Sequence, residues 1–153
     1  MIRLLRTNSE NQEFIALVRC LDAELVIIDG EEHSFYAPFN TIENIRYAIV
    51  AYHDGKPVGC GALKEFVPTV MEIKRMYTAP SSRGMGIASG ILHELENWAS
   101  EMSYDKCLVE TGKRQPEAVA LYKKNGYGLI PNYGQYANVE NSVCFEKHLN
   151  NSD

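Results

Sequence analysis

The segment from Glu72 to Ala88 constrains the fold of this chain more than any other. It runs from a strand-like stretch through a Pro/Ser turn into Arg-Gly-x-Gly and then into an amphipathic helix. Gly84 and Gly86 lack the Cβ atoms that would keep a ligand away from the main chain. The first N–H groups of the helix have no partner within it, and the helix dipole is positive there. Together with Arg83, these donors predict a loop that binds a pyrophosphate.

The helix that follows this loop is expected to cover about residues 84–102. Its apolar side chains recur at helical spacing and form one broad face, which indicates a helix packed against a core. The apolar positions are Ile87, Ile91, Leu92, Leu95, Trp98, Ala99 and Met102.

The rest of the chain alternates between strand and helix patterns, without a linker or repeat. Asn8-Ser9, with Gln12 three residues after Ser9, predicts a capped helix with apolar residues at helical spacing. A turn at residues 53–56 predicts a hairpin, and Gly126 is a plausible helix stop. The predicted strands cover 2–6, 47–52, 57–66, 69–78, 107–110 and 142–147, a further helix covers 116–124, and 29–40 is a short helix or loop.

Two motifs make the chain similar to a known family. The loop Arg83-Gly84-Met85-Gly86-Ile87-Ala88 follows a strand, and about thirty residues later comes Ala118-Val119-Ala120-Leu121-Tyr122-Lys123-Lys124-Asn125-Gly126-Tyr127. In this order they resemble the GNAT superfamily of acetyl-CoA-dependent N-acetyltransferases. Two positions depart from the family pattern: Ser81 stands where the loop usually has Gln or Arg, and Gln115 stands where an Asn often precedes the second motif.

The resemblance implies one α/β (α+β mixed) domain over residues 1–153, with a mixed, mostly antiparallel, twisted sheet of about six to seven strands and helices on both faces. It also implies acetyl-CoA as co-substrate. The pantetheine arm is then expected along Met76 and Thr78, and the pyrophosphate on the loop. The implied cofactor-binding residues are Met76, Thr78, Arg83, Gly84, Met85, Gly86, Ile87, Ala88, Gln115 and Asn125.

The same resemblance suggests two catalytic residues. Tyr122 matches the tyrosine that family members often use as general acid, and a phenol is protonated at pH 7 and can donate to a departing thiolate. Glu72 matches a position where some members keep a general base, although an ordinary Glu must be buried to become a better base. The alternatives that stay open are Tyr122 as a packing residue, Glu72 as a solvated carboxylate, and Glu65 or Glu110 as the base.

Composition and charge exclude several other classes. The 153 residues are 45% apolar and 23% charged, which is ordinary for a globular protein. The net charge of −5 and the absence of a long basic run argue against nucleic acid. No apolar run is long enough to span a membrane, and no signal peptide is evident, so a cytoplasmic location is expected.

Cysteines and histidines show no spacing typical of a metal site, so no metal is expected. The scattered cysteines, Cys20, Cys60, Cys107 and Cys144, are interpreted as reduced and mostly buried thiols.

The expected reaction is transfer of an acetyl group to a primary amine of a small molecule or peptide by direct attack. Acidic and aromatic residues at 29–36 and 131–136 lie in regions that shape the acceptor pocket in similar proteins, and they suit a small amine. An amino acid, a polyamine, an aminoglycoside and a protein N-terminus stay open as acceptors, and so does the oligomeric state, including a homodimer. The alternative is a non-catalytic sensor of acyl-CoA or another nucleotide. A nicotinamide-binding Rossmann domain is disfavoured because its glycine pattern is not evident.

Overall fold

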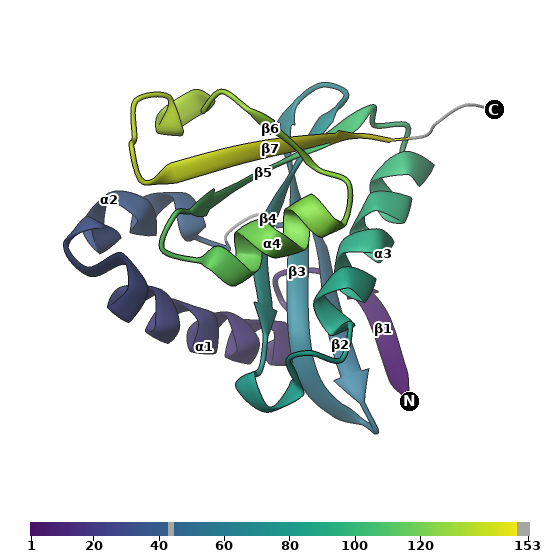
Figure 1. Ribbon diagram of the computed structural model, residues 1–153. Coiled ribbons are helices and arrows are strands. Elements are labelled where there is room, and N and C mark those ends of the chain that lie inside the picture. Colours follow the sequence, from purple (N-terminus) through teal and green to yellow (C-terminus); the bar gives the residue numbers. More distant parts are fainter. Residues whose placement is uncertain (43–44, 150–153) are drawn as a thin grey trace.

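Seven strands form one sheet in the computed structural model, which describes residues 1–42 and 45–149 (Figure 1). The strand order is β1-β2-β3-β4-β5-β7-β6, and β4 and β5 form the one parallel pair in this order. The predicted mixed, mostly antiparallel sheet is confirmed. The strands are β1 (Ile2–Thr7), β2 (Tyr47–His53), β3 (Lys56–Val67), β4 (Val70–Thr78), β5 (Lys106–Gly112), β6 (Gly128–Ile130) and β7 (Ser142–His148).

Helices cover both faces of the sheet, as expected. The helices are α1 (Gln12–Asp29), α2 (His33–Tyr36), α3 (Ile87–Glu101) and α4 (Pro116–Lys124). Short 3-10 turns are η1 (Gly30–Glu32), η2 (Ala37–Asn40), η3 (Pro80–Ser82) and η4 (Gly134–Tyr136). Successive side chains of a strand point to opposite faces, so Ala48 and Val50 pack with α1, whereas Ile49 and Ala51 pack with α3. Figure 1 shows α3 and α4 together, with α1 apart from them.

The starts of two helices differ from the expected ones. Helix α1 is capped by Asn11, whose side chain accepts hydrogen bonds from the N–H groups of Glu13 and Phe14, each at 2.9 Å. The predicted cap at Asn8-Ser9 is therefore wrong, since Asn11 lies where the chain enters the helix. Helix α3 begins at Ile87 and not at residue 84, because Gly84 and Gly86 both have positive φ angles that interrupt a right-handed helix.

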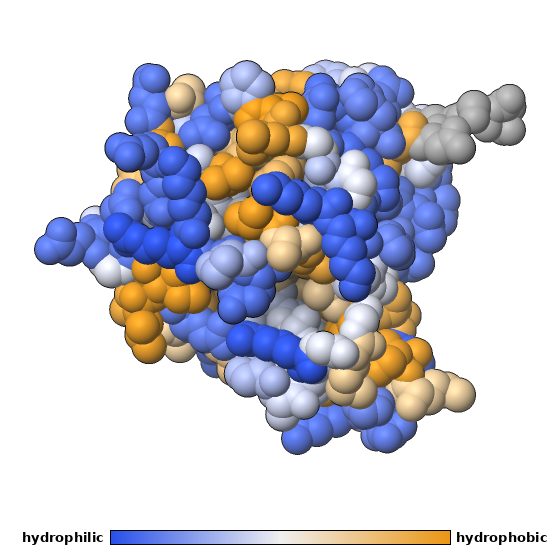
Figure 2. Space-filling view, in the orientation of Figure 1, coloured by the Kyte–Doolittle hydropathy of each residue, from blue (hydrophilic) through white to orange (hydrophobic). Residues whose placement is uncertain are grey.

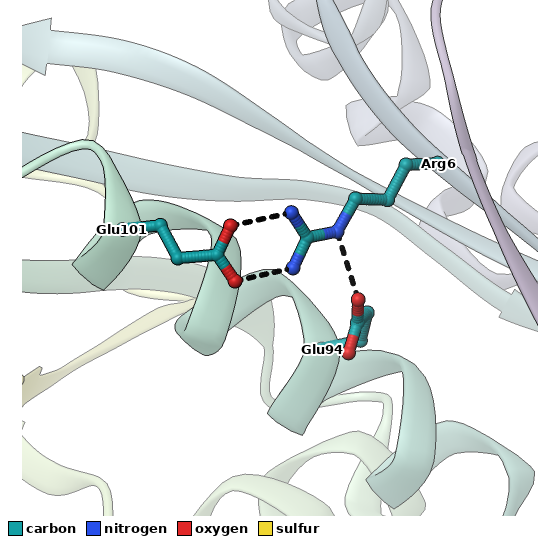
Figure 3. A network of polar contacts seen from close by, with 3 residues as sticks. All are labelled: Arg6, Glu94 and Glu101. Carbon is teal, nitrogen blue, oxygen red and sulfur yellow. Dashed lines mark hydrogen bonds and ion pairs between the residues drawn. The ribbon is translucent and has the colours of Figure 1, made fainter.

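The edge strand β1 is tied to α3 by one arginine (Figure 3). Arg6 donates from Nη1 and Nη2 to the two carboxylate oxygens of Glu101, at 2.7 and 2.8 Å, and from Nε to Glu94 at 2.8 Å. Its guanidinium also lies 5.0 Å from the centre of the Trp98 ring. Such a bidentate pair fixes geometry more strongly than a single contact, so it sets the position of α3 against the edge of the sheet.

β4 and β5 stay together for only part of their length. Their register runs from Val70 opposite Lys106 to Ile73 opposite Val109, and no further pairing of these strands occurs among the described residues. On its other side β4 has a bulge against β3, and Arg75 within this bulge has a φ of 56°. A bulge bends its strand, so β4 turns away while β5 continues along β7.

Three smaller features complete the comparison with the expected elements. Strand β6 was not predicted, because three residues give no readable alternation. The last strand extends one residue further than expected, to His148. The segment 29–40 contains η1, α2 and η2, which agrees with the expected short helix or loop.

Candidate active site

A cavity of about 540 Å³ lies where β4 and β5 diverge. Its walls come from these two strands, from α1 and α4, and from the loop that precedes α3. Figure 2 shows pale residues of intermediate hydropathy in a recess near the centre of the view, bordered by both hydrophilic and hydrophobic side chains. The cavity lining combines uncharged residues with charged ones from the strands, α1 and α4.

The loop before α3 presents free main-chain donors to this cavity. Gly84 and Gly86 have φ angles of 82° and 79°, and a Cβ atom built on either would meet open space. The first bond within α3 runs from the N–H of Gly90 to the carbonyl of Gly86, at 3.0 Å, and no side chain caps the helix. The donors of the first turn thus remain open beside the cavity, which fits a diphosphate group.

The side chain of Arg83 is already engaged. Its Nε donates to the carbonyl oxygen of Thr78 at 2.8 Å, and Nη2 pairs with the Glu24 carboxylate of α1 at 2.9 Å. The guanidinium is half-exposed at the cavity, so its pair with Glu24 is a weak surface contact. An anion at the loop competes with Glu24 for this cation.

Tyr122 is held by the end of α4. Gly126 has a φ of 89°, and the N–H of Tyr127 donates to the Tyr122 carbonyl at 3.0 Å, which is the pattern of a Schellman motif. The Tyr122 ring packs against Tyr127 and Phe145 at centroid distances of 5.7 and 6.0 Å. The side chain is 4% exposed and lines the cavity. Burial, and then the charge of Glu110, raise the pKa of Tyr122, so its phenol keeps its proton at pH 7.

Glu72 and Lys74 point from β4 into the same cavity, since alternate residues of a strand share a face. Glu72 is 6% exposed and Lys74 9% exposed. The Tyr133 hydroxyl donates to Glu72 Oε2 at 2.8 Å, and Lys74 Nζ lies 4.0 Å from the same oxygen. Burial lowers the pKa of Lys74, against the opposing effects of the Glu72 and Glu110 charges.

Glu110 faces this pair from β5. Burial raises the pKa of Glu110 to about 7, with further upward effects from Glu72 and Asp29, whereas a hydrogen bond with Ser142 and the charge of Lys74 oppose the shift. The Ser142 hydroxyl lies 3.0 Å from the Tyr36 hydroxyl, which keeps it in place. A carboxyl that titrates near neutral pH can both accept and release a proton under ordinary conditions.

The structure brings most of the predicted site residues to one cavity. Glu72, Tyr122 and all the predicted cofactor-binding residues except Met85 and Asn125 line it. The Met85 side chain is 48% exposed. Asn125 donates to Ser89 Oγ at 3.2 Å and to the Leu121 carbonyl at 2.8 Å, so it joins α4 to α3. Of the two alternative bases, Glu110 lines the cavity, whereas the exposed Glu65 bonds to Tyr104.

Lys74 and Arg114 are among the cavity residues that the sequence analysis missed. Lys74 shares the alternation of Glu72 along the strand, and this period of two is the signal that could have found it. Arg114 donates to the Asp29 carbonyl at 2.8 Å and pairs with Glu32 at 3.0 Å, so it joins the β5–α4 loop to the end of α1. Nothing local in the sequence indicates that long-range contact.

The cysteines agree with their expected state. Cys60, Cys107 and Cys144 are free and buried, and Cys20 is free and exposed. No group of residues that could hold a metal ion occurs within 1–42 and 45–149. In the same ranges, each helix is too short or too polar to span a bilayer.

Residues 11–127 match the model of the acetyltransferase (GNAT) family. An IAA acetyltransferase of Azospirillum brasilense is 29% identical over 97% of this chain and 98% of its own. A Klebsiella pneumoniae protein described as an acyl-CoA N-acyltransferase has 31% identity and a TM-score of 0.81, over 97% of this chain and 98% of its own. A Thermoplasma acidophilum N-acetyltransferase solved with coenzyme A shares the fold at 16% identity, with a TM-score of 0.71 over 97% of this chain and 99% of its own.

The chain therefore belongs to the GNAT acetyltransferase family, as the resemblance indicated. It is an acyltransferase, and the acetyl donor of this family is acetyl-CoA. The expectation of a transferase with acetyl-CoA as co-substrate is confirmed. Because the chain belongs to a family of acyltransferases, the alternative of a non-catalytic sensor domain is set aside.

Glu110 should make the stability of the protein depend on pH. Its folded pKa of about 7 exceeds the ordinary value of 4.5, so the folded state holds a proton that the unfolded state has released between these values. Stability from this group falls as pH rises from about 4.5 to 7, by at most about 3 kcal/mol. Urea unfolding at pH 5 and pH 8 should show that Glu110→Gln gains stability relative to wild type at pH 8. If the stability difference between Glu110→Gln and wild type is equal at both pH values, the raised pKa of Glu110 is contradicted.

Proposed function

We propose that this protein transfers the acetyl group of acetyl-CoA to a primary amine of a small molecule or peptide, with a carboxylate as general base and Tyr122 as general acid. The observation that carries the proposal is that one cavity is lined both by a carboxyl with a pKa near 7 and by a protonated, buried phenol. Such a pair of groups can take a proton from an amine and give one to a thiolate without a change of pH.

Glu110 serves as the base in this proposal, in preference to Glu72. A base works best when its pKa lies near the working pH, and the pKa of Glu110 is raised to about 7. Glu72 is held by Tyr133 and lies beside Lys74, which suits it to bind and orient an ammonium group. The attacking amine loses its proton to Glu110 and attacks as the free base.

Tyr122 donates its proton to the sulfur that leaves. Its raised pKa keeps the phenol neutral until charge develops on the sulfur. Gly84 and Gly86 hold the diphosphate of the co-substrate on main-chain donors of the first turn of α3, and Met76 and Thr78 line the groove that leads from this loop to Tyr122. Acetyl-CoA supplies the activated thioester.

Direct attack by the amine agrees with the state of the cysteines. Burial raises the pKa of Cys60 and of Cys107 to about 12 and that of Cys144 to about 11, so these thiols stay protonated and are poor nucleophiles. The cavity wall is built without any of the cysteines in the described part of the chain. An acetyl-cysteine intermediate therefore has no support here.

The polar end of the cavity suits a cationic acceptor. Asp29, Glu72 and Glu110 line it together with the cations Lys74, Arg75 and Arg114. Arg75 is paired with Asp22 and Arg114 with Glu32, so the cavity carboxyl groups can attract an alkylammonium group. The relative from Azospirillum brasilense takes its name from IAA, but 29% identity does not carry that acceptor to this cavity. We therefore propose an amine as the acceptor.

Gly86→Ala should abolish or strongly weaken acetyl-CoA binding, because the new methyl group stands where the main chain meets the diphosphate. In a thermal-shift titration, acetyl-CoA at 100 times its dissociation constant should stabilise the wild-type protein by about 2.7 kcal/mol. Gly55→Ala is a matched control: it has a φ of 84° and also meets open space, but it lies in the β2–β3 turn. It shares the strain and should keep the full ligand-induced shift. Equal shifts in both variants contradict the proposed loop.

Tyr122→Phe should lower kcat by about 100-fold or more, since it removes the proton donor but keeps the ring that packs on Tyr127 and Phe145. Thiol release is measured with acetyl-CoA and a panel of butylamine, putrescine, phenethylamine and a short peptide. The acetyl-CoA thermal shift should stay at the wild-type value, which shows that the variant still folds and binds. Unchanged turnover refutes the acid role, and no thiol release with any of these amines contradicts the proposed reaction.

A further inference from the structure

Lys74 is an amine that the proposed reaction does not use, although it lies inside the reaction cavity. Its side chain is 8% exposed, and its Nζ lies 4.0 Å from Glu72 Oε2. Lys74 lines the same cavity as Glu110 and Tyr122, which supply the base and the acid. A buried lysine is costly to keep charged, so burial there needs partners or a role.

The charges around Lys74 indicate which chemical groups can bind at this end of the cavity. Glu72, Glu110 and Asp29 all line the cavity. The charges of Glu72 and Glu110 favour the cationic form of Lys74, and those of Lys64 and Arg75 oppose it. The neighbouring cations Arg75 and Arg114 are paired with Asp22 and Glu32, so a further anion such as a substrate carboxylate is disfavoured beside Glu72 and Glu110. The site is thus built for an amine, and the protein's own amine already occupies part of it.

Burial also favours the reactive form of this amine. It lowers the pKa of Lys74, so a larger fraction of the side chain is neutral than for an exposed lysine. Glu110, on the neighbouring strand, lines the same cavity and its charge acts on Lys74, so it supplies a base within the cavity. Lys74 therefore has the three features that an acceptor requires: location, a neutral fraction and a base.

We infer that Lys74 is a self-acetylation site, which takes the acetyl group from bound acetyl-CoA when no other amine fills the cavity. This inference rests on the proposed function, because it uses the same thioester position. Lys74 Nζ first gives a proton to Glu110 and then attacks the thioester carbonyl carbon. The C–N bond forms and the C–S bond breaks, the second nitrogen proton is lost to water, and Tyr122 or water protonates the sulfur. The products are Nζ-acetyl-Lys74 and coenzyme A.

The modified enzyme should be blocked. Acetylation removes the cation beside Glu72 and puts an acetyl group where an acceptor amine must bind. The reaction is a dead end for the enzyme unless a deacetylase removes the group.

The test is incubation of the full chain with acetyl-CoA alone, followed by intact mass and peptide mapping. Lys64 is the matched control within the same molecule, since it is an exposed lysine on the adjacent β3. Lys74 should be acetylated faster than Lys64 by about tenfold or more, because bound reactants are held together. Its rate should saturate with acetyl-CoA, whereas chemical acetylation of Lys64 rises linearly. Lys74→Arg should lose the fast phase.

A thermal shift with acetyl-CoA in the same samples separates the two proposals. If acetyl-CoA stabilises the protein and Lys74 is acetylated no faster than Lys64, self-acetylation is refuted and the proposed function stands. If acetyl-CoA gives no stabilisation, the proposed function fails and this inference fails with it. Tyr122→Phe should slow the modification of Lys74 without slowing that of Lys64, and equal rates in wild type and variant overturn the shared mechanism.

Discussion

The bulge at Arg75 is the constraint on which the rest of the site depends. Between Cys60 and Ala62 of β3, strand β4 places one residue more, and Arg75 takes a φ of 56° there. The Arg75 side chain is buried and paired with Asp22 of α1, and its carbonyl accepts a bond from Cys60 Sγ at 3.4 Å. These contacts come from two different elements and hold a backbone angle that a non-glycine residue otherwise avoids.

The space between the two strands depends on the divergence of β4 and β5. Had β4 and β5 stayed paired, their main-chain groups would bond to each other and no room for a ligand would exist between them. With the strands apart, the edge of β4 is open to an extended ligand, while Glu72 and Glu110 face one space from two strands. Tyr133 donates a hydrogen bond to Glu72, and Ser142 forms a hydrogen bond with Glu110.

The sequence predicted the parts of the site that depend on local geometry. Gly84 and Gly86 could be interpreted because a loop that binds an anion through its main chain needs glycine, whereas Tyr122 was found by its match to the family motif. The order of strands and helices followed from local sequence patterns, and the mixed sheet was implied by the family resemblance. The family resemblance then supplied the roles.

What the sequence could not predict depends on contacts between distant residues. The raised pKa of Glu110 needs the burial of its carboxyl in the folded protein, and the engagement of Arg83 needs Glu24 of α1. Asn125 bonds to Ser89 of α3, which lines the cavity, and this contact between two helices could not be predicted from the sequence either. Lys74 was passed over because a charged residue in a strand is usually interpreted as solvated, and only the fold shows that it is buried.

The most direct test of the account is the pH dependence of kcat/KM in wild type, Glu110→Gln and Glu72→Gln, with the amine from the panel that reacts fastest. The account predicts an acidic limb near pH 7 in wild type, because Glu110 must be ionised to accept the proton. The limb should persist in Glu72→Gln and disappear in Glu110→Gln, which should retain little activity. If the limb near pH 7 persists in Glu110→Gln and is lost in Glu72→Gln, the base has been assigned to the wrong strand.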